Sequence, residues 1–133
     1  MTDIEKLVKQ AESRLGEAYA PHSNYHVGAA VLTKSGEVYT GVNIENDNYT
    51  NTRHAEETAI MKAVDDGHRE ITHLAVVTQD NSNESDDVRG RESPEPCGSC
   101  KQTITQFIDG SIEVALGHTE GFRVVELTEE FQL

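Results

Sequence analysis

Residues 27–42 have the sequence VGAAVLTKSGEVYTGV, and this stretch decides the fold. It contains an apolar run over residues 27–32, then the polar turn KSG at residues 34–36, and then a second run over residues 37–42. Short apolar runs of this kind form strands, and a polar turn that contains glycine joins two of them in a hairpin. The stretch therefore predicts a β-hairpin.

Two stretches with helical spacing flank the hairpin. Before it, a helix is expected to end near Gly16, with an apolar stripe formed by Ile4, Leu7, Val8, Ala11 and Leu15. After it, a helix is expected to begin at or near His54 and to end at Gly67, with a stripe formed by Ala55, Ala59, Ile60, Ala63 and Val64. Residues 43–52, NIENDNYTNT, form an unusually long Asn-rich loop between hairpin and helix, and such loops often hold function.

The rest of the chain predicts a buried strand, an acidic exposed loop, a third helix, two short strands and a last helical turn. These cover, in that order, residues 71–78, 79–95, 97–108, 112–117, 122–127 and 127–133. No internal repeat or long linker divides the chain. We therefore expect one α/β domain over residues 1–133, a length that suits a single hydrophobic core.

The composition is strongly acidic. Against 11 Lys and Arg stand 24 Asp and Glu, so the formal net charge is −13. Such a surface repels phosphates, which argues against nucleic-acid and anionic-membrane partners. The acid excess also resembles the surface of proteins adapted to molar salt, where a Debye length of about 3 Å screens self-repulsion.

Targeting signals and disulfides are not expected. The N-terminal residues MTDIEKLVKQ are charged where a signal peptide would need an apolar core, and no apolar run is long enough to cross a bilayer. We therefore expect a soluble, cytoplasmic protein. The two cysteines, Cys97 and Cys100, form a C-x-x-C pair, which in a reducing compartment indicates metal or redox chemistry.

Two helix starts carry side chains suited to one metal ion. His54 opens one helix, and Cys97 and Cys100 lie in the first turn of another. Zinc takes imidazole nitrogen and thiolate sulfur in tetrahedral geometry, and three protein ligands leave a fourth position for water, as in catalytic sites. Glu56, two residues after His54, is placed to act as a general acid and base.

Each part of this constellation has a simpler explanation by itself. The cysteines could be a redox pair, His54 an ordinary helix residue, and the acidic residues after it a solvated helix start. However, H-x-E followed by P-C-x-x-C is the pattern of the zinc nucleobase deaminases. The match at residues 54–56 and 96–100 is complete, which sets the chance of coincidence at roughly one in twenty.

Most of the chain resembles the small, homotetrameric cytidine deaminases of pyrimidine salvage. The resemblance is carried by the segments APHSNYHVGAAVL, TGVNIENDNYTNTRHAEETAI and PEPCGSCKQ. It implies a three-layer α/β/α fold with a five-stranded mixed sheet, a homotetramer, and one Zn²⁺ per subunit. It also implies that Asn43 and Glu45 hold the ribose hydroxyls and that Tyr25 packs at the pyrimidine pocket. The ordinary alternatives are a turn residue, a solvated carboxylate and a core aromatic, respectively.

The sequence departs from the usual short-chain pattern at the metal site. Most such relatives have Cys where His54 stands, and Arg where Glu57 stands. Zinc with three thiolates carries a formal charge of −1, whereas zinc with one neutral His and two thiolates is formally neutral, so the arginine is no longer required. Arg53 is then expected to be mainly a surface charge. The chain also lacks a clear counterpart of a C-terminal aromatic that relatives lend to a neighbouring subunit, although Phe131 could replace it.

The expected reaction is the hydrolytic deamination of cytidine, and also of 2′-deoxycytidine, with Glu56 as the proton carrier. One alternative is a deaminase of another small aminated ring, such as a blasticidin-type nucleoside, because that group shares both motifs. A second alternative is a non-catalytic zinc-stapled binding module, which would normally close the fourth ligand position.

Overall fold

The computed structural model describes residues 3–48, 52–80, 104, 106–108, 111–118 and 121–128. These contain two α-helices, one 3₁₀ helix and five strands. Their bounds are α1 Asp3–Glu12, η1 Leu15–Glu17, β1 Tyr25–Thr33, β2 Val38–Val42, α2 Ala55–Asp65, β3 Ile71–Asp80, β4 Ser111–His118 and β5 Gly121–Thr128. None of the described helices is both long and apolar enough to span a bilayer.

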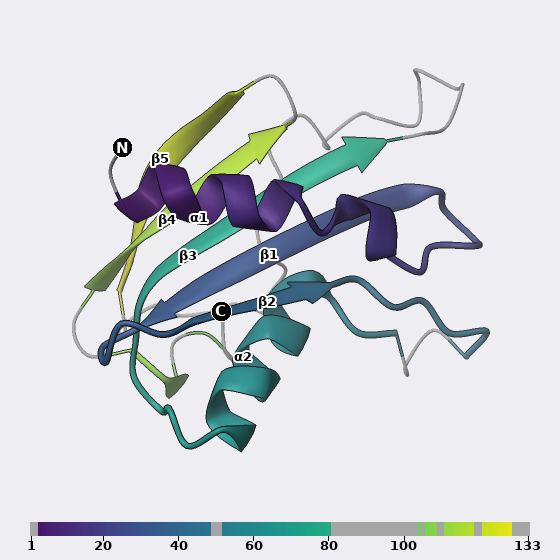
Figure 1. The fold of residues 1–133 in the computed structure, drawn as a ribbon. Coiled ribbons are helices and arrows are strands. Elements are labelled where there is room, and N and C mark those ends of the chain that lie inside the picture. Colours follow the sequence, from purple (N-terminus) through teal and green to yellow (C-terminus); the bar gives the residue numbers. More distant parts are fainter. Residues whose placement is uncertain are drawn as a thin grey trace.

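The strands form one mixed sheet in the order β2-β1-β3-β4-β5 (Figure 1). β1 pairs antiparallel with β2 and with β3, and β4 pairs antiparallel with β5. β3 and β4 are parallel, with Leu74 opposite Val114, so the chain between them crosses from one end of the sheet to the other. The predicted hairpin and five-stranded mixed sheet are confirmed.

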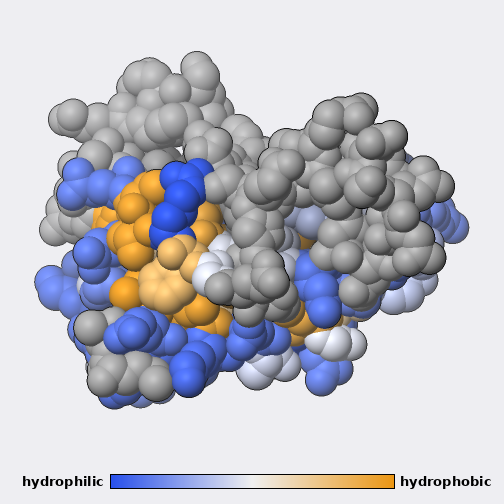
Figure 2. Space-filling model, turned by 90° about the horizontal axis from the view of Figure 1, so that it is seen from above, coloured by the Kyte–Doolittle hydropathy of each residue, from blue (hydrophilic) through white to orange (hydrophobic). Residues whose placement is uncertain are grey.

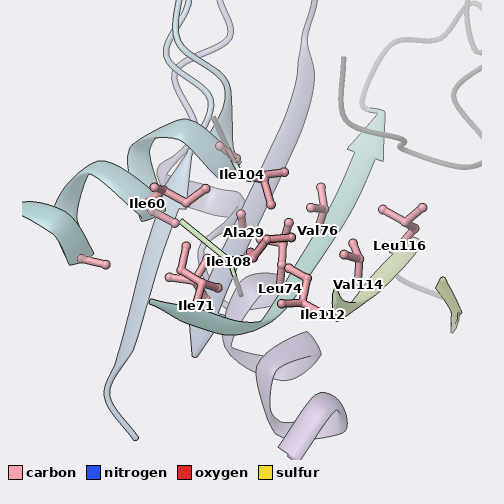
Figure 3. Close-up of a cluster of buried hydrophobic side chains, with 14 residues drawn as sticks. Ala29, Ile60, Ile71, Leu74, Val76, Ile104, Ile108, Ile112, Val114 and Leu116 are labelled. Carbon is pink, nitrogen blue, oxygen red and sulfur yellow. The ribbon is translucent and has the colours of Figure 1, made fainter. Parts of the chain in front are cut away.

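Helices cover both faces of the sheet (Figure 1). Alternate residues along the central strands point to opposite faces. Ala30, Ala75, Val77 and Ala115 pack with α1 in one cluster that also contains Leu7, Ala11 and Leu15. Side chains from the same strands pack with α2 on the other face (Figure 3), including Ala29, Leu74, Val76, Val114 and Leu116. Burial on both faces produces the predicted three layers.

Two glycines let the helices approach the sheet closely. A Cβ on Gly28 of β1 would lie 2.2 Å from the backbone oxygen of Ala11 in α1. A Cβ on Gly41 of β2 would lie 2.4 Å from the backbone nitrogen of Ala59 and 2.6 Å from the carbonyl oxygen of Ala55 in α2. Real Cβ atoms do not approach backbone this closely, so only glycine permits both contacts.

The structure corrects some predicted boundaries. β3 extends to Asp80, where the sequence predicted the start of a loop, because its last residues pair with the first residues of β1. β5 continues through Thr128, so the predicted last helical turn is wrong at residues 127 and 128, where pairing with β4 holds the chain extended. Of the predicted third helix, residues 104 and 106 are helical and the first turn lies outside the described residues. Residues 129–133 also lie outside them.

The strand β5 forms one edge of the sheet and leaves apolar side chains accessible. Phe122 and Val124 are 40% and 44% exposed. Figure 2, which views the molecule from the side on which β5 lies in Figure 1, shows apolar side chains gathered around a strongly hydrophilic one.

Candidate functional site

The predicted substrate residues lie at the end of the sheet where β1 begins and β2 ends (Figure 1). Two segments meet there: residues 18–24, and residues 43–48 together with residues 52–54. Ile44 joins them through its backbone, because it bridges in parallel to Tyr19 and antiparallel to Arg53. The nitrogen of Glu45 also donates to the oxygen of Tyr19 at 2.8 Å. This end of the sheet is therefore a framework of backbone hydrogen bonds that can hold side chains in place.

Asn43 is buried and fastens the start of β1. Its Oδ1 accepts a hydrogen bond from the backbone nitrogen of Val27 at 3.0 Å, and its Nδ2 donates to the carbonyl oxygen of Tyr25 at 2.8 Å. An amide side chain offers two N–H donors and two acceptor lone pairs, so these contacts use half of its capacity. Asn43 therefore stabilises the fold, and one donor and one acceptor of its side chain are still available to a ligand.

Glu45 is the main side-chain contact between the two loops. Its Oε1 accepts from the backbone nitrogens of His22 and Ser23 at 2.8 and 3.2 Å, and its Oε2 accepts from the Ser23 hydroxyl at 2.5 Å. Partial burial raises the pKa of Glu45, but these three donors outweigh that effect and lower the pKa below its ordinary value. Glu45 is therefore an ionised acceptor in a fixed orientation.

A cavity of about 320 Å³ opens beside Glu45. It is lined by His22, Ser23, Glu45, Asn46, Asp47 and Thr52. Its volume lies at the small end of the roughly 300 to 1,000 Å³ that small-molecule sites occupy. All six lining residues have polar or charged side chains, but most of the surface that they present to the cavity is carbon, so the cavity can accept both hydroxyl groups and an apolar part of a ligand.

His54 sits at the N-terminal cap of α2, as the sequence predicted. Its backbone nitrogen donates to Oε1 of Glu57 at 2.9 Å, and its Nδ1 lies 3.2 Å from the same oxygen. This carboxylate fixes the orientation of the imidazole, in the way that hydrogen bonds orient metal-ligating histidines generally. When Nδ1 carries the proton, Nε2 has the lone pair that a metal ion requires.

Glu56 differs sharply from its neighbour Glu57. It is buried, with 6% of its surface exposed. Burial raises the pKa of Glu56, opposed by its own backbone hydrogen bond and by the nearby His54. This upward shift of the pKa is in the direction that suits a carboxyl acting as a general acid and base.

The sheet sets the position of this helix start. The hydroxyl of Thr58 donates to the carbonyl oxygen of Val42, the last residue of β2, at 2.8 Å. Gly41 allows the backbone of α2 to contact the same strand. His54 and Glu56 are thereby held next to the strand end from which Asn43 and Glu45 follow.

The two predicted cysteine ligands lie outside the described residues. Within the described part of the chain, no three His, Cys, Asp or Glu side chains are grouped as a metal site. The chain is described again at Ile104, four positions after Cys100, and Ile104 is buried in the same cluster as Ala55, which follows His54 (Figure 3). One oriented imidazole and two thiols are donor types that fit zinc and leave a fourth position open, so the carboxyl of Glu56 is not needed as a ligand.

Tyr25 is the first residue of β1, and it lies outside the set of side chains that line the cavity. Its backbone is held at both polar groups, because its nitrogen donates to Ser23 Oγ at 3.1 Å and its oxygen accepts from Asn43.

Sequence analysis missed the roles of His22, Ser23 and Glu57. The position of Glu57 three residues after a helix cap was an available signal, because this is where a capping carboxylate stands. No local pattern indicates that Ser23 contacts Glu45.

Comparisons with known proteins identify relatives of this chain. Residues 1–116 match the model of the cytidine and deoxycytidylate deaminase zinc-binding region. A cytidine deaminase of Sporosarcina psychrophila is 43% identical over 119 residues, which cover 90% of this chain and 80% of the relative. A blasticidin-S deaminase of Bacillus cereus is 34% identical over 105 residues, covering 79% of this chain and 72% of the relative. The crystal structure of a cytidine deaminase from Burkholderia pseudomallei superposes with a TM-score of 0.80 at 33% identity, covering 96% of this chain and 94% of that one.

Proposed function

Because this chain belongs to the cytidine and deoxycytidylate deaminase family, we propose that Glu56 moves the protons of a hydrolytic deamination. The enzyme is a hydrolase that deaminates cytidine. The observation that carries the role of Glu56 is its burial at the start of α2, which raises its pKa. We extend the proposed substrates to 2′-deoxycytidine.

The proposed proton transfers use one carboxyl twice. Glu56 takes a proton from water as the water oxygen bonds to C4 of the pyrimidine, and it delivers that proton to N3. It then carries the remaining hydroxyl proton to the exocyclic amine as the C4–N4 bond breaks with its electron pair on nitrogen. Cytidine and water thus become uridine and ammonia.

Zinc is the implied cofactor, because the matching region is a zinc-binding one. We propose that His54, Cys97 and Cys100 hold one zinc ion per subunit. When bound, the metal would supply the Lewis acidity that makes water nucleophilic near neutral pH. Glu57 orients the His54 ring for this role.

We propose that Asn43 and Glu45 bind the ribose hydroxyls and that Tyr25 packs at the pyrimidine. The rigid, ionised carboxylate of Glu45 and the cavity beside it support the role proposed for Glu45. An acceptor that is already oriented loses little conformational entropy when a hydroxyl binds. We further propose a homotetramer that works in cytoplasmic pyrimidine salvage, with a small nucleoside rather than nucleic acid or membrane as its partner.

A blasticidin-type nucleoside is a second candidate substrate. The similarity to the Bacillus cereus blasticidin-S deaminase favours including it. Measuring ammonia release with cytidine, 2′-deoxycytidine and blasticidin S distinguishes the two candidate substrate classes. Turnover of blasticidin S with none of cytidine would reverse the assignment.

The role of Glu56 is tested by Glu56→Gln, which removes the proton carrier and preserves the shape of the side chain. We expect cytidine turnover to fall by about 10² to 10⁴-fold, with zinc content and the circular dichroism spectrum retained. The matched control is Glu12→Gln at the exposed end of α1, which should leave turnover unchanged. A folded, zinc-loaded Glu56→Gln enzyme with nearly full activity would contradict the proposal.

A further inference from the structure

Two positively charged side chains from different layers of the fold lie near the edge strand β2. Among the described strands, β2 pairs only with β1 (Figure 1). Arg14 stands between α1 and η1 on one face of the sheet, and Lys62 belongs to α2 on the other face. Neither residue lines the cavity beside Glu45.

The side chain of Arg14 runs across β1 to β2. Its Cβ lies 3.6 Å from the position that a Cβ on Gly28 of β1 would take, and its Nη1 donates to the hydroxyl oxygen of Thr40 in β2 at 3.4 Å. Its Nε is buried and has no hydrogen-bond partner among the described residues. Buried donors without a partner are rare in proteins, and a bound ion is one of the few reasons for them. The guanidinium, with five N–H donors, therefore has donors left for a further acceptor.

Lys62 approaches the same edge from the other layer. It lies one helical turn after Thr58, whose hydroxyl donates to the carbonyl oxygen of Val42 at 2.8 Å. It also lies one turn before Asp66, whose carboxylate accepts a hydrogen bond from the hydroxyl of Tyr39. Residues four apart share one side of a helix, so this row of α2 runs along β2 from its last residue back towards its start. Lys62 is therefore placed beside the middle of β2.

The charges of these two side chains are not balanced by a nearby carboxylate. Burial lowers the pKa of Lys62 below its ordinary value, and the guanidinium of Arg14 lowers it further. In the described part of the chain, no carboxylate forms an ion pair with either residue. The chain has 24 acidic and only 11 basic residues, so two neighbouring cations without an acidic partner are unexpected. Their charge remains for a ligand.

We propose that Arg14, Thr40 and Lys62 form a binding site for a small oxyanion of charge −2, such as inorganic phosphate, at the edge of β2. Two positive charges match a dianion. The planar guanidinium supplies paired N–H donors and the ammonium a point charge, while the hydroxyl of Thr40 accepts from Arg14 and keeps its own hydrogen to donate. The net charge of −13 opposes every anion, so we expect a dissociation constant of about 1 to 10 mM.

The test titrates inorganic phosphate into the zinc-loaded protein at constant ionic strength and follows phosphorus NMR, at about pH 8, where phosphate is mainly a dianion. Arg14→Gln and Lys62→Gln should each raise the dissociation constant about tenfold, because each removes one charge beside the ligand. Lys62→Arg keeps the charge and should stay within about threefold of the wild type. Circular dichroism verifies that each variant is folded.

The matched control is Lys34→Gln, which removes an exposed lysine on the hairpin turn that pairs with Glu70. It should leave the dissociation constant within about twofold of the wild type. Equal constants in the wild type, Arg14→Gln and Lys62→Gln would overturn the proposal. An equal rise in Lys34→Gln would also overturn it, because net charge alone would then explain the effect. So would the lack of saturable binding to the wild type up to about 50 mM phosphate.

Cytidine turnover distinguishes this site from the deaminase site. Arg14→Gln and Lys62→Gln should deaminate cytidine at the wild-type rate, because neither residue lines the cavity beside Glu45. Folded variants that lose phosphate binding and turnover together would contradict a separate site.

The same variants test another use of a cationic edge. Lysines at sheet edges prevent strand pairing between copies of a protein. Light scattering that shows larger assemblies of Lys62→Gln, together with unchanged phosphate binding, would assign Lys62 to edge protection and overturn the anion site. Unchanged assembly size with weakened phosphate binding supports the anion site.

Discussion

The stability of the fold depends on the protonation state of Glu45. Its folded-state pKa is lowered by the His22 and Ser23 donors against the opposing effect of burial. A lowered pKa means that the ionised form stabilises the folded state above the ordinary value of 4.5 and that this contribution is lost as the pH falls through the folded pKa. Acid should therefore loosen the two loops at this end of the sheet.

The substitution Glu45→Gln removes that titration. We expect the free energy of unfolding of the variant to depend less steeply on pH below about pH 5 than that of the wild type. Urea denaturation at several pH values measures the slope, and Glu12→Gln on the exposed face of α1 serves as the control for a lost surface carboxylate. Parallel curves for the wild type and Glu45→Gln would show that folding does not lower the pKa of Glu45.

At the scale of elements, the contact between α2 and β2 places the proposed catalytic helix start. Gly41 leaves no room for a side chain, since the nearest atoms to its would-be Cβ are the Ala59 nitrogen at 2.4 Å, the Thr58 hydroxyl at 2.5 Å and the Ala55 oxygen at 2.6 Å. Two of these atoms belong to the backbone of α2, so a side chain at position 41 would fit only if the helix moved. A shift there would carry His54 and Glu56 with it.

Gly41→Ala should therefore destabilise the protein by about 1–3 kcal/mol, the usual cost of overpacking. Urea denaturation gives the change in the free energy of unfolding. Gly16→Ala is the matched control, because a Cβ at Gly16 meets nothing within 4 Å among the described residues. Equal stability of the two variants would contradict the close packing of α2 on β2.

At the scale of the whole molecule, the net charge affects the stability of the folded state. A net charge of −13 on 133 residues makes the compact state repel itself, and dissolved ions screen that repulsion. We expect the melting temperature to rise as KCl increases from about 0.05 M to above 1 M. Calorimetry across this range measures the melting temperature. An uncharged osmolyte is the control for stabilisation by any solute that is excluded from the protein surface. A melting temperature that is flat or falls in KCl would show that self-repulsion does not limit stability.

Much of the architecture could be predicted because its signals are local. The apolar runs on either side of the KSG turn define β1 and β2, and the stripe from Ala55 to Ala63 defines the buried face of α2. The residues at which helices and strands end were less predictable. β3 reaches Asp80 because its last residues pair with the start of β1, more than 50 residues away in sequence, and that partner is invisible to a local pattern.

The sequence by itself determined the types of most elements and the candidate residues for the chemistry, since hydrophobic period and side-chain type are properties of short segments. Only the tertiary structure decided that Asn43 fastens β1, that Glu45 binds the loop at His22 and Ser23, and that Glu56 is buried while Glu57 holds His54. The physical reason is that burial and hydrogen bonding depend on groups brought together by the packing of distant segments. Those contacts set the pKa and the orientation of each candidate residue.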